Sequence, residues 1–181
     1  SSRFNADVNN VLAFAEDSNG KLWLGTLTRE LTGYDPAGGK FESIPLPHLY
    51  EGKYVRGLQK MFIDSDNLLW IGSQAGMYVY DLLNREWHTG FNQALFNQIG
   101  NKLITGIRED RDGIIWIATD GTGLFMFSKR EKTVQNLSFK PGDPKSISTN
   151  GLYSLYIDSD NIVWTGTYKQ GLDYYKKVRK I

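Results

Sequence analysis

The 181-residue chain contains no cysteine and only two histidines, His48 and His88. The absence of cysteine excludes a disulfide framework, thiol catalysis and cysteine-ligated metals. Two lone histidines do not form a zinc site. No apolar run approaches the roughly 20 residues that a membrane-spanning helix needs. The net charge is only +1, so no overall field favours nucleic acid or an anionic membrane. We therefore expect no cofactor, no metal, no nucleic-acid partner and no direct membrane contact.

A short phrase is repeated four times along the chain, at residues 17–26, 64–73, 110–119 and 158–167. Each copy starts with a turn aspartate and has a tryptophan six residues later, then a small residue and a hydroxyl residue. The tryptophans at positions 23, 70, 116 and 164 recur about every 47 residues, a period typical of repeat architectures. The aspartate-rich turns lack the further ligands of a calcium loop, so we interpret them as turns and predict no metal site.

One repeat can be divided into four short apolar runs at residues 58–63, 68–72, 77–80 and 85–90, separated by turn residues. Four short strands per repeat are typical of a β-propeller blade. An i, i+3 apolar spacing, as in Val11 and Phe14, would also suit a helix, but runs of about six residues favour strands. The sequence predicts an all-β fold, a single propeller fragment with four-stranded antiparallel blades at about 8–46, 54–91, 103–139 and 151–181.

The residues that recur in every copy are expected to build the blades rather than to bind ligands. Each tryptophan should fill the space between adjacent blades, and its indole N–H should then need a hydrogen-bond partner. A small residue two positions later should allow the flanking blade to approach closely. These structural positions are Trp23, Trp70, Trp116 and Trp164, with Gly25, Gly72 and Gly166, and Ala118 in the third copy.

The repeat resembles the two-component regulator propeller family, whose pattern has a turn Asp, a Gly, Leu-Trp-Ile-Gly-Thr, and then Gly-Leu with an aromatic residue. The closing part of that pattern appears at residues 76–80, 123–127 and 171–175. The first copy departs from it because Glu30 stands where the others have glycine. The turn glycine is replaced by Asn67 and Asn161 in two copies, and asparagine also tolerates a left-handed conformation.

The resemblance implies a fragment of the periplasmic sensor ectodomain of a hybrid two-component histidine kinase. It implies a glycan-derived signal that controls polysaccharide-utilisation genes, an oligosaccharide or other small ligand, and neighbouring propeller repeats of the parent protein as partners. The fragment itself is not expected to be an enzyme. The alternatives are a polysaccharide-acting propeller enzyme (a lyase or hydrolase) and a purely structural interaction propeller.

A ligand site should lie where the repeat is broken, since functional residues of repeat proteins occupy variable loops on one face. The sequence assigns no catalytic residue. The variable positions after the tryptophan strands and before the first strands include two arginines, an aspartate and a tyrosine that suit sugar binding. These candidate ligand-binding residues are Arg29, Arg56, Asp120 and Tyr168.

The last copy stops before the position at which its fourth strand should begin, so we expect a truncated last blade. Residues 2–4 could be the end of another outer strand. Four blades in an open arc would expose two apolar blade faces, which a monomer tolerates poorly. We therefore expect a homodimer, with two arcs closing head to tail into an eight-bladed ring.

Overall fold

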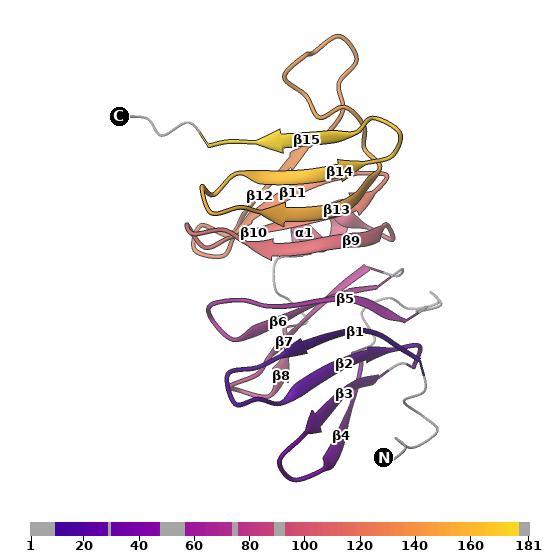
Figure 1. Ribbon diagram of the computed structural model, residues 1–181, viewed down its shortest axis with the longest axis vertical. Helices are drawn as coiled ribbons and strands as arrows, with labels where there is room; N and C mark the ends of the chain where they lie inside the picture. Colours follow the sequence, from indigo (N-terminus) through magenta and orange to yellow (C-terminus); the bar gives the residue numbers. More distant parts are fainter. Residues whose placement is uncertain (1–9, 29, 48–56, 74–75, 89–92, 178–181) are drawn as a thin grey trace. The chain divides into compact units, whose positions relative to one another are not determined.

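The computed structural model describes residues 10–28, 30–47, 57–73, 76–88 and 93–177 (Figure 1). Its regular structure is strand apart from one short helix, so the predicted all-β class is confirmed. The chain divides into two compact units, Ser1–Phe91 and Asn92–Ile181. No helix in the described ranges is long and apolar enough to cross a membrane. Because the relative placement of the two units is not determined, each is described by itself.

The first unit contains two four-stranded antiparallel sheets, in which each strand pairs with the next along the chain. The first sheet comprises β1 (Val11–Glu16), β2 (Leu22–Thr26), β3 (Glu30–Asp35) and β4 (Lys40–Pro45). The second comprises β5 (Leu58–Ile63), β6 (Leu68–Ser73), β7 (Gly76–Asp81) and β8 (Glu86–Trp87). Its fourth strand ends at Trp87, and residues 89–90 of the run predicted at 85–90 lie outside the described residues.

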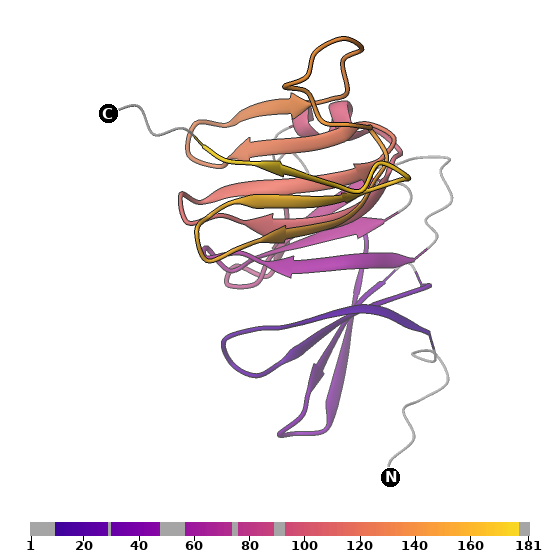
Figure 2. The same cartoon turned by 45° about the horizontal axis from the view of Figure 1, so that its top comes forward.

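The second unit repeats this plan, with a third sheet of four strands and a fourth sheet of three in the described residues. The third sheet comprises β9 (Leu103–Glu109), β10 (Ile114–Asp120), β11 (Gly123–Ser128) and β12 (Thr133–Leu137). The fourth comprises β13 (Leu152–Ile157), β14 (Val163–Thr167) and β15 (Leu172–Tyr175). Both views show the loop between β12 and β13, drawn in orange, projecting beyond the sheets of this unit (Figures 1 and 2).

The helix α1 (Gln93–Ile99) precedes the third sheet and was not predicted. Leu95, Phe96 and Ile99 are buried, and spacings of three and four residues place 95, 96 and 99 on adjacent parts of a helical surface. The segment lies between two copies of the repeat, where the strand pattern gave no expectation. Its apolar spacing was the signal that could have identified it.

Each turn aspartate supplies the hydrogen-bond partner of the tryptophan in its own copy. The indole N–H groups of Trp23, Trp70, Trp116 and Trp164 donate to Oδ2 of Asp17, Asp64, Asp110 and Asp158 at 2.9, 2.7, 2.8 and 2.7 Å. The other carboxylate oxygen accepts backbone N–H groups two and four residues further on, as Asp64 Oδ1 does from Asp66 and Leu68. One carboxylate thus closes the turn and satisfies a ring that would otherwise bury an unpaired donor.

The tryptophan of the first blade in each unit packs against a tyrosine of the next blade. Trp23 and Tyr80 have ring centroids 5.9 Å apart at 52°. Trp116 and Tyr175 have centroids 5.3 Å apart at the same angle. The rings therefore lie between adjacent blades, and tilted pairs of this kind are favourable beyond their buried area.

Close approach between blades depends on a glycine in both units, but on a different strand in each. A Cβ at Gly25 on β2 would collide with the Leu58 carbonyl of the next blade. In the second unit Ala118 stands at that position, and its cross-strand partner on β9 is Gly106. A Cβ at Gly106 would come within 2.5 Å of the Leu155 Cβ. The first blade has the reverse pair, with Ala13 on β1 opposite Gly25 on β2. The alanine of the pair therefore lies on the first strand of one blade and on the second strand of the other.

Ion pairs also join the blades within each unit. In the first unit, Glu42 of β4 accepts from Arg85 at 2.7 Å and from Lys21. Burial alone would raise the pKa of Glu42, but hydrogen bonds from Lys21 and Arg85 outweigh it and lower the pKa. In the second unit, the Lys177 ammonium donates to Asp110 at 2.8 Å and to Asp112 at 2.9 Å. Burial opposes the charge of Lys177, but these carboxylates prevail and raise its pKa.

Candidate functional site

Two of the four predicted site residues, Asp120 and Tyr168, lie on either side of Gly151. A Cβ built on Gly151 would be 3.4 Å from Asp120 Oδ1 and 3.4 Å from the Tyr168 Cβ. Asp120 ends β10, and Tyr168 follows β14. Residues that are far apart in sequence therefore meet at one edge of the second unit, where loops of its two sheets come together.

Backbone hydrogen bonds hold this arrangement in place. The Asn150 carbonyl accepts from Gly121 N at 2.9 Å and from Gly123 N at 3.1 Å. The Gly151 carbonyl accepts from Tyr168 N at 2.9 Å. Asp120 and Gly151 also form an isolated antiparallel bridge. The segment at 150–151 is thus tied to both neighbouring loops, which preorganises the side chains around it.

The edge presents two half-exposed aromatic rings. Tyr153 is 52% and Tyr168 is 48% exposed, and their ring centroids are 5.6 Å apart at 57°. The Lys169 ammonium lies 4.9 Å from the Tyr168 ring centroid, a cation–π distance. Lys169 adopts a left-handed φ of 60°, which is uncommon for a residue with a side chain. Together Asp120, Gly151, Tyr153, Tyr168 and Lys169 define what we call the Asp120–Tyr168 edge.

The chemistry of this edge suits binding. Exposed aromatic faces offer apolar surface, Asp120 offers hydrogen-bond acceptors, and Lys169 offers donors. Lys102 adds a second cation, since its Nζ would lie 3.7 Å from a Cβ at Gly121. In the described ranges, no group of three or more His, Cys, Asp or Glu residues could hold a metal ion.

The other two predicted site residues, Arg29 and Arg56, lie outside the described residues, so their roles stay predictions. His48 also lies outside them. Tyr153 was missed by the sequence analysis because it lies within β13, where a framework role was expected. The signal was available, since tyrosine at 153 stands where the other first strands have Leu12, Gln59 and Thr105.

Comparison with known proteins connects this fold to a family. The family model of the two-component regulator propeller matches residues 6–28 and 98–121. Histidine kinase P4 of Formosa agariphila is 30% identical over 104 residues, which make up 56% of this chain and 8% of that protein. The chain thus spans a small part of the kinase that it matches.

Two solved structures share the architecture. One is the extracellular domain of a B. thetaiotaomicron protein described as a hybrid two-component system, with a TM-score of 0.76 and 21% identity over 93% of this chain and 22% of that one. The other is a catalytically inactive virginiamycin B lyase from Staphylococcus aureus, with a TM-score of 0.63 and 15% identity over 96% of this chain and 58% of that one. At these identities the likeness concerns the fold alone. Two copies of the repeat thus match the model of the two-component regulator propeller, and the sheets share the fold of β-propeller blades.

Proposed function

We propose that the chain is part of the periplasmic sensor ectodomain of a hybrid two-component system and helps to bind a glycan-derived ligand. Two of its repeats match the regulator propeller model, one relative is a histidine kinase, and a structural neighbour is the extracellular domain of a protein described as a hybrid two-component system. The observation that supports ligand binding is the Asp120–Tyr168 edge, where two exposed tyrosine rings lie beside charged groups. Such a ligand would report the presence of a polysaccharide and so control the genes for its use.

Each group at the edge has a role that sugar chemistry requires. A pyranose ring has an apolar face of C–H groups, which can pack on an aromatic ring such as Tyr168 or Tyr153. Its hydroxyls need acceptors and donors, which Asp120 and Lys169 supply. We infer that the chain binds rather than cleaves its ligand. Incubation with polysaccharide should therefore release no new reducing or unsaturated ends.

A calorimetric screen of neutral oligosaccharides against the complete ectodomain tests the binding role. Y168A should weaken the affinity for a ligand found in the screen by at least about tenfold, equivalent to about 1.4 kcal/mol. Y156A is the matched control, because Tyr156 is also an exposed tyrosine, at 62%, on β13 outside the edge. Equal affinities for the wild type and Y168A would remove the edge from the proposal.

We also propose that the isolated chain forms a homodimer through two apolar blade faces. Phe14 on β1 is 69% exposed, whereas Ile107 and Leu155 at the corresponding positions are buried. Leu172 on β15 is 61% exposed, whereas Leu31 and Leu124 at its corresponding positions are buried. Leu31, Leu124 and Leu155 belong to the apolar cores within the two units. A second copy would cover Phe14 and Leu172 here, and neighbouring repeats would do so in the parent protein.

Light scattering tests this association. The wild-type chain should have twice the monomer mass at about 50 µM, and F14E should shift it towards monomer by placing a charge in the contact. L83E is a control, since Leu83 is 71% exposed in the turn after β7. A wild-type chain that stays monomeric at this concentration would contradict the proposal.

A further inference from the structure

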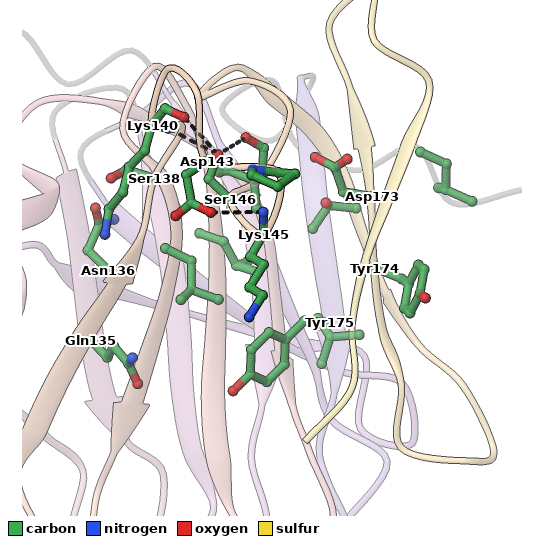
Figure 3. Close-up of a pocket in the computed structure, with 17 residues that line it drawn as sticks. Gln135, Asn136, Ser138, Lys140, Asp143, Lys145, Ser146, Asp173, Tyr174 and Tyr175 are labelled. Carbon is green, nitrogen blue, oxygen red and sulfur yellow. Dashed lines mark hydrogen bonds between the residues drawn. The ribbon is translucent and has the colours of Figure 1, made fainter. Parts of the chain in front are cut away.

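A pocket of about 510 Å³ lies within the second unit, between its two sheets (Figure 3). One wall comes from β11 and β12, and the other from β14 and β15. Residues of the loop after β12 close one end. Its volume falls within the roughly 300–1,000 Å³ range of small-molecule sites. We call it the interblade pocket, and it is separate from the Asp120–Tyr168 edge.

The pocket is open because the repeat is broken at one position. Tyr78 and Phe125 occupy the third position of the Gly-Leu-aromatic phrase in two copies, and both side chains are buried. Tyr78 belongs to the core between the first two blades, together with Trp23 and Leu31. In the fourth blade this position is Asp173, which lines the pocket. A short carboxylate thus replaces an aromatic ring, and the space that the ring would fill stays open.

The carboxylate of Asp173 anchors the loop over the pocket. Its Oδ2 accepts from the backbone N and the hydroxyl of Ser148 at 2.8 and 2.9 Å. Within the loop, the backbone N of Lys140 donates to Ser146 Oγ at 3.1 Å, and that of Lys145 to Asp143 Oδ1 at 2.9 Å. Groups of the loop thus donate to both acidic side chains of the pocket, Asp143 and Asp173. No lysine ammonium takes part in these hydrogen bonds.

The Lys145 ammonium is directed into the pocket. Figure 3 shows its side chain extending from the loop toward Tyr175. None of the ion pairs among the described residues involves Lys145. Gln135 lies on the wall of β12 and adds an amide donor and acceptor. A cation without a protein partner, a phenol and an amide therefore line a space whose remaining walls include Leu137 and Val163.

We propose that the interblade pocket binds a carboxylated, polyhydroxylated ligand of one or two sugar rings, with its carboxylate paired to Lys145. The charge-assisted contact at Lys145 would select the acid over its neutral analogue, because hydrogen bonds between ionised groups are roughly twice as strong as neutral ones. Tyr175 and Gln135 would contact the hydroxyls. The apolar wall would pack against ring C–H groups.

The test uses D-galacturonate and its neutral match D-galactose as probes, titrated into the 181-residue chain and followed by NMR. Galacturonate should shift resonances around Lys145 and Tyr175, with galactose binding at least about tenfold more weakly. K145Q should weaken galacturonate binding by at least about tenfold and leave the affinity for galactose unchanged. K40Q is the matched control, since Lys40 is an exposed lysine on β4 of the other unit.

Three results would overturn the proposal. They are equal binding of the two sugars, K145Q binding galacturonate as the wild type does, and no galacturonate shift up to about 20 mM. D173Y gives a second readout, because an aromatic ring at 173 should fill the pocket and abolish galacturonate binding while the chain stays folded. Y168A, which tests the edge, should leave galacturonate binding unchanged. The proposals for the edge and for the interblade pocket can therefore be refuted independently.

Discussion

The two units use one framework and differ in what fills the space between their blades. The tryptophan–tyrosine pairs Trp23–Tyr80 and Trp116–Tyr175 have the same interplanar angle of 52°. Near them, the first unit places the buried Tyr78, whose ring lies 6.1 Å from that of Trp87. The second unit has Asp173 at the position of Tyr78, and Asp173 lines a pocket. The repeated residues thus set how the blades meet, and single departures decide whether the gap becomes core or cavity.

The two units also differ in charge at the position two residues after the tyrosine of each tryptophan–tyrosine pair. Leu82 packs against the apolar core of the first unit. Its counterpart Lys177 forms ion pairs with Asp110 and Asp112 in the second. Asp110 Oδ2 therefore accepts from both the Trp116 indole and Lys177. An apolar contact in one unit is replaced by a charged one in the other, so substitutions at the framework, the pocket and the ion pairs test how far the two units are equivalent.

The largest effect is expected at the framework tryptophans. W116A should lower the free energy of unfolding by about 4 kcal/mol, because it removes a fully buried ring between blades. W164A should cost about half as much, since Trp164 is only partly buried. Denaturant titration of both variants measures the difference. Equal losses would mean that exposure of the last blade has no influence on its tryptophan.

Exchanging the residues at the broken position should be asymmetric. Y78D should cost about 3 kcal/mol or more, because it places an unpaired carboxylate in a buried position. D173Y should change stability by less than about 1 kcal/mol, since filling the cavity offsets the lost hydrogen bonds to Ser148. Thermal and denaturant unfolding would show this. If Y78D were as mild as D173Y, the gap of the first unit could admit charge as readily as that of the second.

The exchanged methyl group gives a smaller effect that can be rescued. G25A should cost about 2 kcal/mol, because its Cβ would collide with the Leu58 carbonyl. The double variant A13G/G25A reproduces the arrangement of Gly106 and Ala118, and it should recover more than half of the loss. A13G alone is the control and should cost about 0.5–1 kcal/mol, as glycine does within a strand. Without any recovery in the double variant, the exchange would not be compensatory.

The smallest effect concerns the ion pairs. K177M should lower the free energy of unfolding by about 1 kcal/mol at pH 7, and less in high salt, because the pairs are partly exposed. The pKa of Lys177 is raised above its ordinary value of 10.5. Its contribution is therefore complete below that pH and is lost as the pH rises through the higher folded value. The difference between wild type and K177M should shrink only in that alkaline range.

E42Q provides the reciprocal measurement in the first unit. The pKa of Glu42 is lowered from 4.5, so its contribution is present above that pH and is lost as the pH falls through the folded value. The wild-type advantage over E42Q should therefore disappear in acid, and that over K177M in alkali. Loss of both at the same end of the pH scale would contradict the assigned directions.

The sequence predicted the framework well because the framework is periodic. Four copies of one phrase were enough to identify the blades, the turns and the small residue beside each tryptophan. The helix at 93–99 was missed because it falls between copies. Tyr153 and Asp173 were missed because a repeat was expected to hold where it did not. Asp120 and Tyr168 were identified as departures, but only the fold shows that both flank Gly151.

The pair of positions shared by Ala13–Gly25 and Gly106–Ala118 has a consequence for how such repeats tolerate change. Considered position by position, Ala118 replaces the expected glycine, and Gly106 places a destabilising residue within a strand for no evident reason. Taken as a cross-strand pair, the two blades hold the same volume. What is constrained is then the combined volume of the cross-strand pair rather than the identity of either residue. A single substitution at either position would lower stability, while the paired exchange would recover much of that loss.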